Sequence, residues 1–233
     1  MQKTLDFIRQ NSLALFSLLM AVIFSVWFFL NSAELQMRLS ELRNRSLSPS
    51  ASPATVASYP DISNYPYLGE INAPVVFVEY GDYRCGYCNR FNQETLPLLK
   101  AAYIDSGLVK FVFKDFILFG AESQSLAEAT HCANEQGAFW SAHDAIFDSV
   151  TDSEAGTAEN ILASVIVKTG LDASRLQACL ESGKYSQLVS ASTQEAVSFG
   201  IDGTPSSIIN GQLVVGAVPF AQFQTLIDSE LNR

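Results

Sequence analysis

Residues 75–91 read Val-Val-Phe-Val-Glu-Tyr-Gly-Asp-Tyr-Arg-Cys-Gly-Tyr-Cys-Asn-Arg-Phe, and this stretch decides the fold. Its first six residues are mostly β-branched or aromatic, which is typical of a buried strand. From Cys88 onward apolar residues recur at spacings of three and four, which indicates a helix, and a second apolar run at 108–113 predicts the next strand. The sequence therefore predicts a β–α–β unit with Cys85 and Cys88 at the first strand-to-helix turn, where open α/β sheets place their sites.

Cys85 and Cys88 form a Cys-x-x-Cys motif around Gly86 and Tyr87. The N–H groups and the dipole of a helix start favour an anion, so the first sulfur is biased toward the thiolate, which can attack a disulfide. The motif predicts dithiol–disulfide exchange, with the Cys85–Cys88 disulfide as the redox group and no separate cofactor. Half of a zinc site and an inert structural disulfide are the alternatives. No second Cys-x-x-Cys is present to complete a zinc site, and we expect no metal.

Glu79 is a carboxylate inside the apolar strand, six residues before Cys85. Acidic residues are seldom buried without a partner. Burial would raise the pKa of Glu79 and suit it to exchanging a proton with the sulfur of Cys88. The alternative is an edge-strand residue that points to water.

Residues 201–211 read Ile-Asp-Gly-Thr-Pro-Ser-Ser-Ile-Ile-Asn-Gly and form a second signature. Pro205, at the head of an apolar strand, can follow a cis peptide bond, although an ordinary trans turn is the alternative. Asn210-Gly211 predicts a hairpin turn into a strand within 212–218. Pro219 then opens an amphipathic C-terminal helix.

Over residues 67–231 the chain resembles the thioredoxin-fold, DsbA-like thiol–disulfide oxidoreductases of bacterial cell envelopes. The resemblance rests on the block around Cys85-Gly86-Tyr87-Cys88 and on residues 113–116, 132–140 and 203–205. It implies an α/β thioredoxin-like fold with an inserted α-helical subdomain. It also implies that Cys85 attacks, that Cys88 resolves, that Thr204 and Pro205 touch the substrate, and that Glu79 is the buried acid beneath the motif.

Gly86, Tyr87 and Thr204 depart from the best-known oxidase of that family, which carries Pro-His between its cysteines and Val before the proline. They look more like the periplasmic disulfide isomerases. Because the intervening dipeptide lies against the nucleophile and tunes its pKa, two directions stay open: an oxidase, or an isomerase or reductase kept reduced. A non-enzymatic tethered chaperone built on the same scaffold is a further alternative.

The segment from about 120 to 200 is almost entirely helical in pattern, with amphipathic stretches at 123–136, 139–149, 158–169, 174–181 and 185–199. Cys132 and Cys179 fall on two of these helices. An even cysteine count favours a structural disulfide between them; a second redox pair and two free thiols are the alternatives. His131 and His143 are expected to be helix-surface or packing residues.

The N-terminal third predicts an anchor and a spacer. Residues 13–30 carry no charge and are long enough to span a bilayer, and an uncleaved anchor is favoured over a cleaved signal peptide. Residues 1–12 would then be cytoplasmic, and 31–63, rich in Ser, Ala and Pro toward their end, would be a spacer before a domain at 64–231. Flanking charges give no orientation, but thiol–disulfide chemistry places residues 31–233 in the periplasm or exterior, outside the cytoplasmic membrane.

The net charge of −10 over 233 residues argues against nucleic acid as a partner. The expected partners are exported or envelope proteins that contain cysteines. From the family resemblance we also expect a membrane redox partner. This would be a DsbB-like, quinone-linked oxidase, or an electron donor in the isomerase or reductase alternative.

Overall fold

The computed structural model describes residue 20, residues 27–28 and, in the folded domain, residues 54–56, 59–150 and 156–233. The chain divides into two compact units, residues 1–52 and 53–233, and the architecture below is that of the second. Among the described residues, no helix is both long enough and apolar enough to cross a bilayer. The expected segments 1–12 and 13–30 lie outside the described residues, apart from Met20, Trp27 and Phe28.

One mixed sheet of six strands forms the centre of the domain, in the order β1-β6-β5-β3-β4-β2. β3 and β4 are parallel, and every other neighbouring pair is antiparallel. The strands are β1 (Ala54–Thr55), β2 (Tyr67–Leu68), β3 (Val75–Gly81), β4 (Val109–Asp115), β5 (Ser206–Ile209) and β6 (Gln212–Val215). The β3–helix–β4 crossover is the predicted β–α–β unit.

The crossover between β3 and β4 is one helical run with two π-helical turns. It comprises α2 (Gly86–Arg90), a π turn at Phe91–Thr95, α3 (Leu96–Leu99) and a second π turn at Lys100–Ile104. Pro97 lies in the first turn of α3, where its missing N–H is tolerated. Cys85 is the N-cap of this run, so the motif stands at its positive end.

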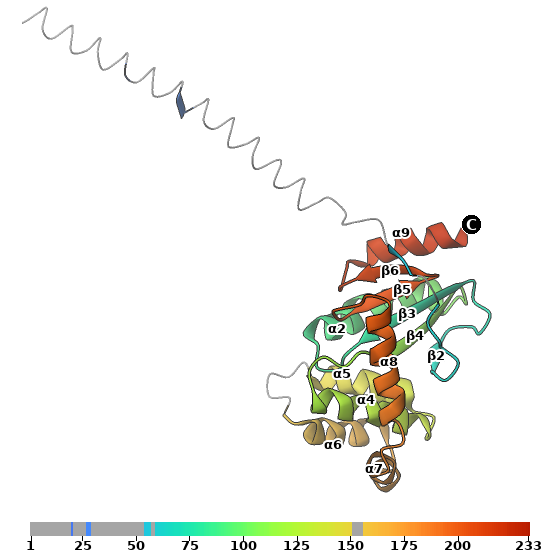
Figure 1. Cartoon of the computed structure of the whole chain (residues 1–233), viewed down its shortest axis with the longest axis vertical. Coiled ribbons are helices and arrows are strands. Elements are labelled where there is room, and N and C mark those ends of the chain that lie inside the picture. The colour runs from blue at the N-terminus through green and yellow to red at the C-terminus, as the bar shows by residue number, and fades with distance from the viewer. Residues whose placement is uncertain (1–19, 21–26, 29–53, 57–58, 151–155) are drawn as a thin grey trace, which may run out of the picture. The chain divides into compact units, whose positions relative to one another are not determined.

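The expected helical insertion is present between β4 and β5. Each boundary of its helices lies within two residues of the predicted one. The helices are α4 (Ala121–Asn134), α5 (Phe139–Val150), α6 (Ala158–Thr169), α7 (Ala173–Glu181) and α8 (Ser186–Ser198). The chain closes with α9 (Phe220–Leu231), which begins directly after Pro219 as predicted. Figure 1 shows α4, α5, α6 and α7 grouped at one end of the sheet, with α9 at the other. These elements confirm an α/β thioredoxin-like fold with a helical insertion.

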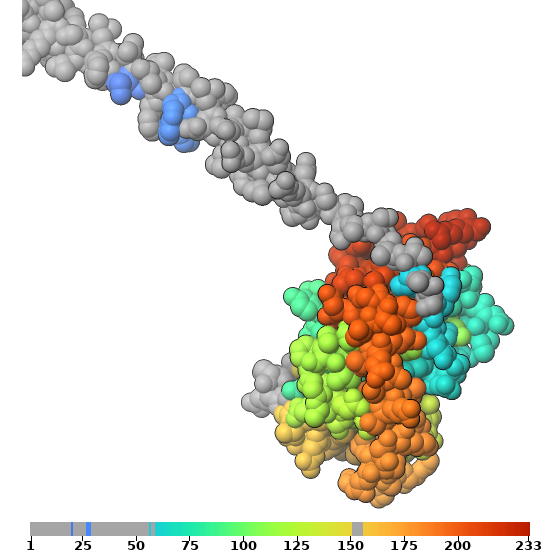
Figure 2. All heavy atoms as spheres, in the orientation of Figure 1, coloured from blue at the N-terminus to red at the C-terminus, as the bar shows by residue number. Residues whose placement is uncertain are grey.

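Alternating residues of β3 pack on opposite faces of the sheet. Phe77 faces the crossover helix and α9, with its ring 6.1 Å from that of Phe91 and 5.3 Å from that of Phe223. Val78 and Tyr80 face the other way, in a cluster with Ala196 on α8. In Figure 2 the orange atoms of α8 run down this second face. Glu79 is two residues after Phe77 on the same strand, so its side chain lies on the same face, toward the crossover helix.

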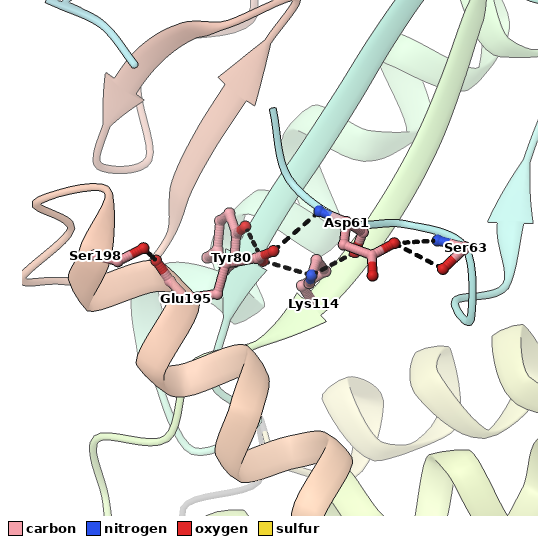
Figure 3. Close-up of polar contacts among 6 residues, drawn as sticks. All are labelled: Asp61, Ser63, Tyr80, Lys114, Glu195 and Ser198. Atoms are coloured by element: carbon pink, nitrogen blue, oxygen red, sulfur yellow. Dashed lines mark hydrogen bonds and ion pairs between the residues drawn. The ribbon is translucent and has the colours of Figure 1, made fainter. Parts of the chain in front are cut away.

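An ion pair between the buried Lys114 and the partly exposed Glu195 links the elements on the second face (Figure 3). Lys114, whose side chain is 3% exposed, lies with its Nζ 2.5 Å from Glu195 Oε2 and donates to the carbonyl oxygen of Asp61 at 2.6 Å. Tyr80 donates from its hydroxyl to the same Glu195 oxygen at 2.6 Å, and the Asp61 N–H donates to the other at 2.9 Å. Glu195 on α8 is thus linked to two strands and to the chain before β2.

The domain begins earlier in the chain than the sequence suggested. β1 pairs Ala54 with Leu213 and Thr55 with Gln212, and Asp61 belongs to the ion-pair cluster. These residues were expected in the spacer 31–63. A two-residue strand shows no periodicity, and its pairing with a strand more than 150 residues later is set by tertiary contacts alone.

Candidate active site

The two cysteines of the motif are free thiols with different environments. Cys85 is 4% exposed, and Cys88, one turn into α2, is fully buried. The Cys85 N–H donates to the carbonyl oxygen of Asp82 at 3.0 Å, which closes the turn from β3 into the helix. Beside them, Gly86 is exposed, and apart from its chain neighbours and the backbone of its own helix no atom lies within 4 Å of the position that a Cβ there would take. The motif is therefore open to an incoming group at Gly86 and closed beneath Cys88.

The surroundings of Cys85 stabilise its thiolate and lower its pKa to about 6. The largest cause is a hydrogen bond from the Cys88 side chain, with further hydrogen bonds from the Thr204 side chain and from the N–H groups of Cys88 and Tyr87. Partial burial opposes these effects without cancelling them. Because the thiolate is the attacking species, Cys85 is prepared for disulfide exchange at neutral pH.

The pKa values of Cys88 and Glu79 are raised, in contrast to that of Cys85. Burial raises the pKa of the Cys88 thiol well above its ordinary value, and the hydrogen bond it gives to Cys85 adds to this. Glu79 is 2% exposed, and burial, followed by the charge of Cys85, raises the pKa of its carboxyl group well above the usual range. Charge on Glu79 also raises the pKa of Cys88. A buried acid whose protonated form is favoured, and which is electrostatically coupled to both sulfurs, can give or take a proton there.

The Glu79 carboxyl group lies beside a tight contact at the end of β3. Gly81 packs so closely on the ring of Phe113 that a Cβ at position 81 would overlap it, and the same position is 3.5 Å from Glu79 Oε1. Phe113 is the β4 partner of Glu79 in the sheet. A side chain at position 81 would therefore displace the Phe113 ring.

The Thr204–Pro205 peptide bond is cis, the geometry that the sequence favoured. It brings the carbonyl oxygen of Thr204 to 3.4 Å from Cys85 Sγ. Thr204 Oγ1 is buried, and its hydroxyl is the side-chain donor that helps to lower the pKa of Cys85. The Pro205 carbonyl accepts from the Gly216 N–H at 2.8 Å, which holds this turn to the end of β6.

Asp82 is a site residue that the sequence analysis missed. Its fully buried carboxylate accepts from the Arg84 N–H at 2.8 Å, the Leu118 N–H at 2.7 Å and the Ser123 hydroxyl at 2.6 Å. It therefore joins the turn before Cys85 to the β4–α4 loop. An Asp after a strand predicts only a local turn; its bonds to residues 36 and 41 positions later carry no sequence signal.

The second pair of cysteines lies apart from the motif in the insertion. Cys132 on α4 and Cys179 on α7 form a disulfide with Cα atoms 5.8 Å apart. It closes a sequence separation of 47, worth about 4 kcal/mol in the chain-entropy model. The structure thus has the disulfide that the cysteine count favoured, and leaves Cys85 and Cys88 as the free thiols of the described residues.

The two histidines are packing residues, and both are buried. His131 Nε2 lies 2.7 Å from Asp115 Oδ2, and the His143 ring lies 4.8 Å from that of Phe113. Within the described ranges no group of His, Cys, Asp and Glu is arranged to hold a metal ion.

Residues 63–229 match the family model described as Thioredoxin. Disulfide bond formation protein D of Bacillus subtilis is 27% identical over 76% of this chain and 82% of its own. "Probable disulfide bond formation protein D" of Bacillus cereus is 32% identical over 71% and 78%. The crystal structure of oxidised BdbD from Bacillus subtilis superposes with a TM-score of 0.70 at 26% identity, covering 77% of this chain and 99% of that one. The chain belongs to the thioredoxin family, and within it to the DsbA-like thiol–disulfide oxidoreductases.

Proposed function

We propose that this protein forms disulfide bonds in exported proteins by exchange at Cys85 and Cys88. The observation that carries the proposal is the position of Cys85: it is the N-cap of α2, its Sγ lies 3.4 Å from the Thr204 carbonyl oxygen, and its surroundings lower its pKa to about 6. A stabilised thiolate is a good leaving group, and it stabilises the reduced form of the pair, which makes the disulfide a stronger oxidant. The names of the Bacillus relatives, disulfide bond formation proteins, support the same direction.

The reaction starts from the Cys85–Cys88 disulfide. A substrate thiolate attacks the sulfur of Cys85; the Cys85–Cys88 bond breaks, and Cys88 leaves with the electron pair. Because a buried thiolate at Cys88 is disfavoured, it takes a proton, for which protonated Glu79 is the nearby source. The mixed disulfide between Cys85 and the substrate lies beside Thr204 and Pro205.

A second thiolate of the substrate then attacks the substrate sulfur of the mixed disulfide. Cys85 leaves as its stabilised thiolate, and the substrate departs with a new disulfide. Two electrons have passed from the substrate to the cysteine pair, so the pair must be reoxidised before the next turnover. Tyr87 and Gly86, which are exposed beside Cys85, are in position to contact the substrate chain.

The test uses the full chain and a peptide with two thiols. Cys85→Ser should abolish oxidation of the peptide by the oxidised chain. Cys88→Ser, mixed with the peptide in its disulfide form, should accumulate the mixed disulfide, because Cys85 attacks the peptide disulfide and Cys88 is no longer there to release it. Cys132→Ser/Cys179→Ser is the matched control, since that pair lies on α4 and α7, and it should still oxidise the peptide. Turnover by Cys85→Ser would contradict the assignment of the nucleophile.

The location and the redox partner are part of the same proposal. A single-pass anchor at 13–30 would hold the domain on the periplasmic or outer side of the cytoplasmic membrane, where a DsbB-like, quinone-linked enzyme could reoxidise Cys85 and Cys88. In intact cells treated with a reductant that does not cross membranes, a thiol reagent that does not cross membranes either should label Cys85. Labelling only after lysis would contradict this orientation.

A further inference from the structure

Arg90, at the end of α2, touches both sides of the candidate active site. Its guanidinium carbon lies 5.0 Å from the centre of the Tyr87 ring, and its Nη2 donates to the carbonyl oxygen of Ala217 at 3.2 Å. Tyr87 is 62% exposed, so most of this ring is not held by packing and remains available to a substrate. Ala217 lies in the turn between β6 and α9.

These contacts connect Arg90 to the residues around the Cys85 sulfur. Ala217 follows Gly216, whose N–H donates to the carbonyl oxygen of Pro205 at 2.8 Å. The neighbouring Thr204 carbonyl oxygen is 3.4 Å from Cys85 Sγ. Tyr87, which Arg90 contacts, follows Cys85 by two residues. The Arg90 side chain thus joins the Tyr87 ring to the Ala217 carbonyl oxygen.

We propose that Arg90 is a positioning residue for substrate binding, which fixes the Tyr87 ring relative to the cis-proline turn across the entrance to Cys85. The inference rests on the proposed exchange at Cys85 and Cys88 and adds a residue to it. An exposed tyrosine samples several rotamers when nothing holds it. Stacking under a guanidinium that is itself anchored to the backbone leaves the ring preorganised, which lowers the entropy lost on binding.

The chemistry of the contact requires arginine. The planar guanidinium can stack on a ring and donate a hydrogen bond at its edge at the same time. A lysine ammonium is a single point and would satisfy one of the two partners only. Arg84 supplies the control, since it carries the same charge next to Cys85 but makes its contacts elsewhere, with Glu122 at 3.6 Å and the Gly156 carbonyl at 3.2 Å.

The test compares the full chain with Arg90→Ala, Arg90→Lys, Arg84→Ala, Tyr87→Ala and the Tyr87→Ala/Arg90→Ala double variant. The substrate is one peptide dithiol, and excess oxidised glutathione reoxidises Cys85 and Cys88 after each turnover. Arg90→Ala should raise KM by about 2- to 5-fold, as expected for an exposed cation–π contact, with kcat unchanged. Arg90→Lys should stay close to Arg90→Ala, and Arg84→Ala should keep the wild-type KM. The reduction potential of the cysteine pair should be the same in Arg90→Ala and wild type, because Arg90 acts on binding.

The double variant separates action through Tyr87 from an independent effect. If Arg90 acts through that ring, Tyr87→Ala/Arg90→Ala should bind no more weakly than Tyr87→Ala alone. Additive effects on KM, or a wild-type KM in Arg90→Ala, would overturn the inference. The same comparison of peptide affinity in a Cys85→Ser background measures Arg90 without the exchange reaction. Failure of the proposed function would differ: the wild-type chain itself would neither oxidise the peptide nor form a mixed disulfide.

Discussion

At the scale of single residues, the division of labour between Cys85 and Cys88 follows from where each sulfur lies. Cys85 is the N-cap and receives hydrogen bonds from Cys88, Thr204 and the first N–H groups of the helix. Cys88 is buried one turn later, next to Glu79. The same dipeptide spacing therefore yields one sulfur that is stable as a thiolate and one that is stable as a thiol.

The pKa of Cys85 predicts a specific pH dependence. The alkylation rate of Cys85 in the reduced chain should rise through a midpoint near pH 6, the value to which its surroundings lower the pKa. The thiolate stabilises the folded reduced form fully above the ordinary thiol pKa of about 8.5, and this stabilisation is lost as the pH falls through about 6. Rates of iodoacetamide labelling from pH 4 to 9 measure the midpoint. A midpoint at the ordinary thiol value would contradict the proposed stabilisation.

Glu79→Gln should slow exchange and stabilise the domain together. The proton donor to Cys88 is lost, and positioned acids contribute about 100-fold or more to such transfers. Burial raises the pKa of Glu79 above its value in the unfolded chain. The carboxyl group therefore destabilises the folded state above the usual carboxyl pKa, and the loss grows as the pH rises toward the raised pKa. The neutral amide removes that cost. Stopped-flow oxidation and urea unfolding at pH 7 give the two quantities; a wild-type rate would exclude Glu79 from the mechanism.

At the scale of secondary structure elements, the sheet separates catalysis from support. The crossover helix and the motif lie on one face, while α8 is tied to the other face by Lys114 and Glu195 (Figure 3). Residues on the second face should therefore affect stability more than exchange.

Lys114→Met should destabilise the domain by about 2 kcal/mol, because it removes the charged donor to Glu195, whose side chain is 21% exposed, and to the Asp61 carbonyl oxygen. Lys110→Met on the same strand is the control: its ammonium lies over the partly exposed Tyr67 ring at 4.9 Å, a contact worth about 1 kcal/mol or less. Urea unfolding of both variants measures the difference. Equal losses of unfolding free energy in the two variants would contradict a larger contribution from the Lys114–Glu195 pair. A changed exchange rate at 25 °C in folded Lys114→Met would contradict the separation of the two faces.

At the scale of the whole molecule, the sequence predicted what local patterns encode. The β–α–β unit, the helices of the insertion and the hairpin at Asn210-Gly211 all follow from periodicity and turn residues, and the structure has them. It did not predict β1, β2, or the π-helical turns that flank α3, because short edge strands and helix irregularities are decided by packing. The clamp made by Asp82 and the bridge made by Arg90 depend on residues brought together by the fold, so no spacing in the sequence indicates them.

The most direct test of the central claim is the reduction potential of the Cys85–Cys88 pair. It would be measured for the full chain in glutathione buffers, with the Cys132–Cys179 disulfide intact. A stabilised Cys85 thiolate beside a buried Cys88 predicts a strongly oxidising pair, with a value nearer the roughly −120 mV of DsbA than the −270 mV of thioredoxin. A value close to that of thioredoxin would contradict the account, because such a pair would reduce disulfides in exported proteins rather than form them.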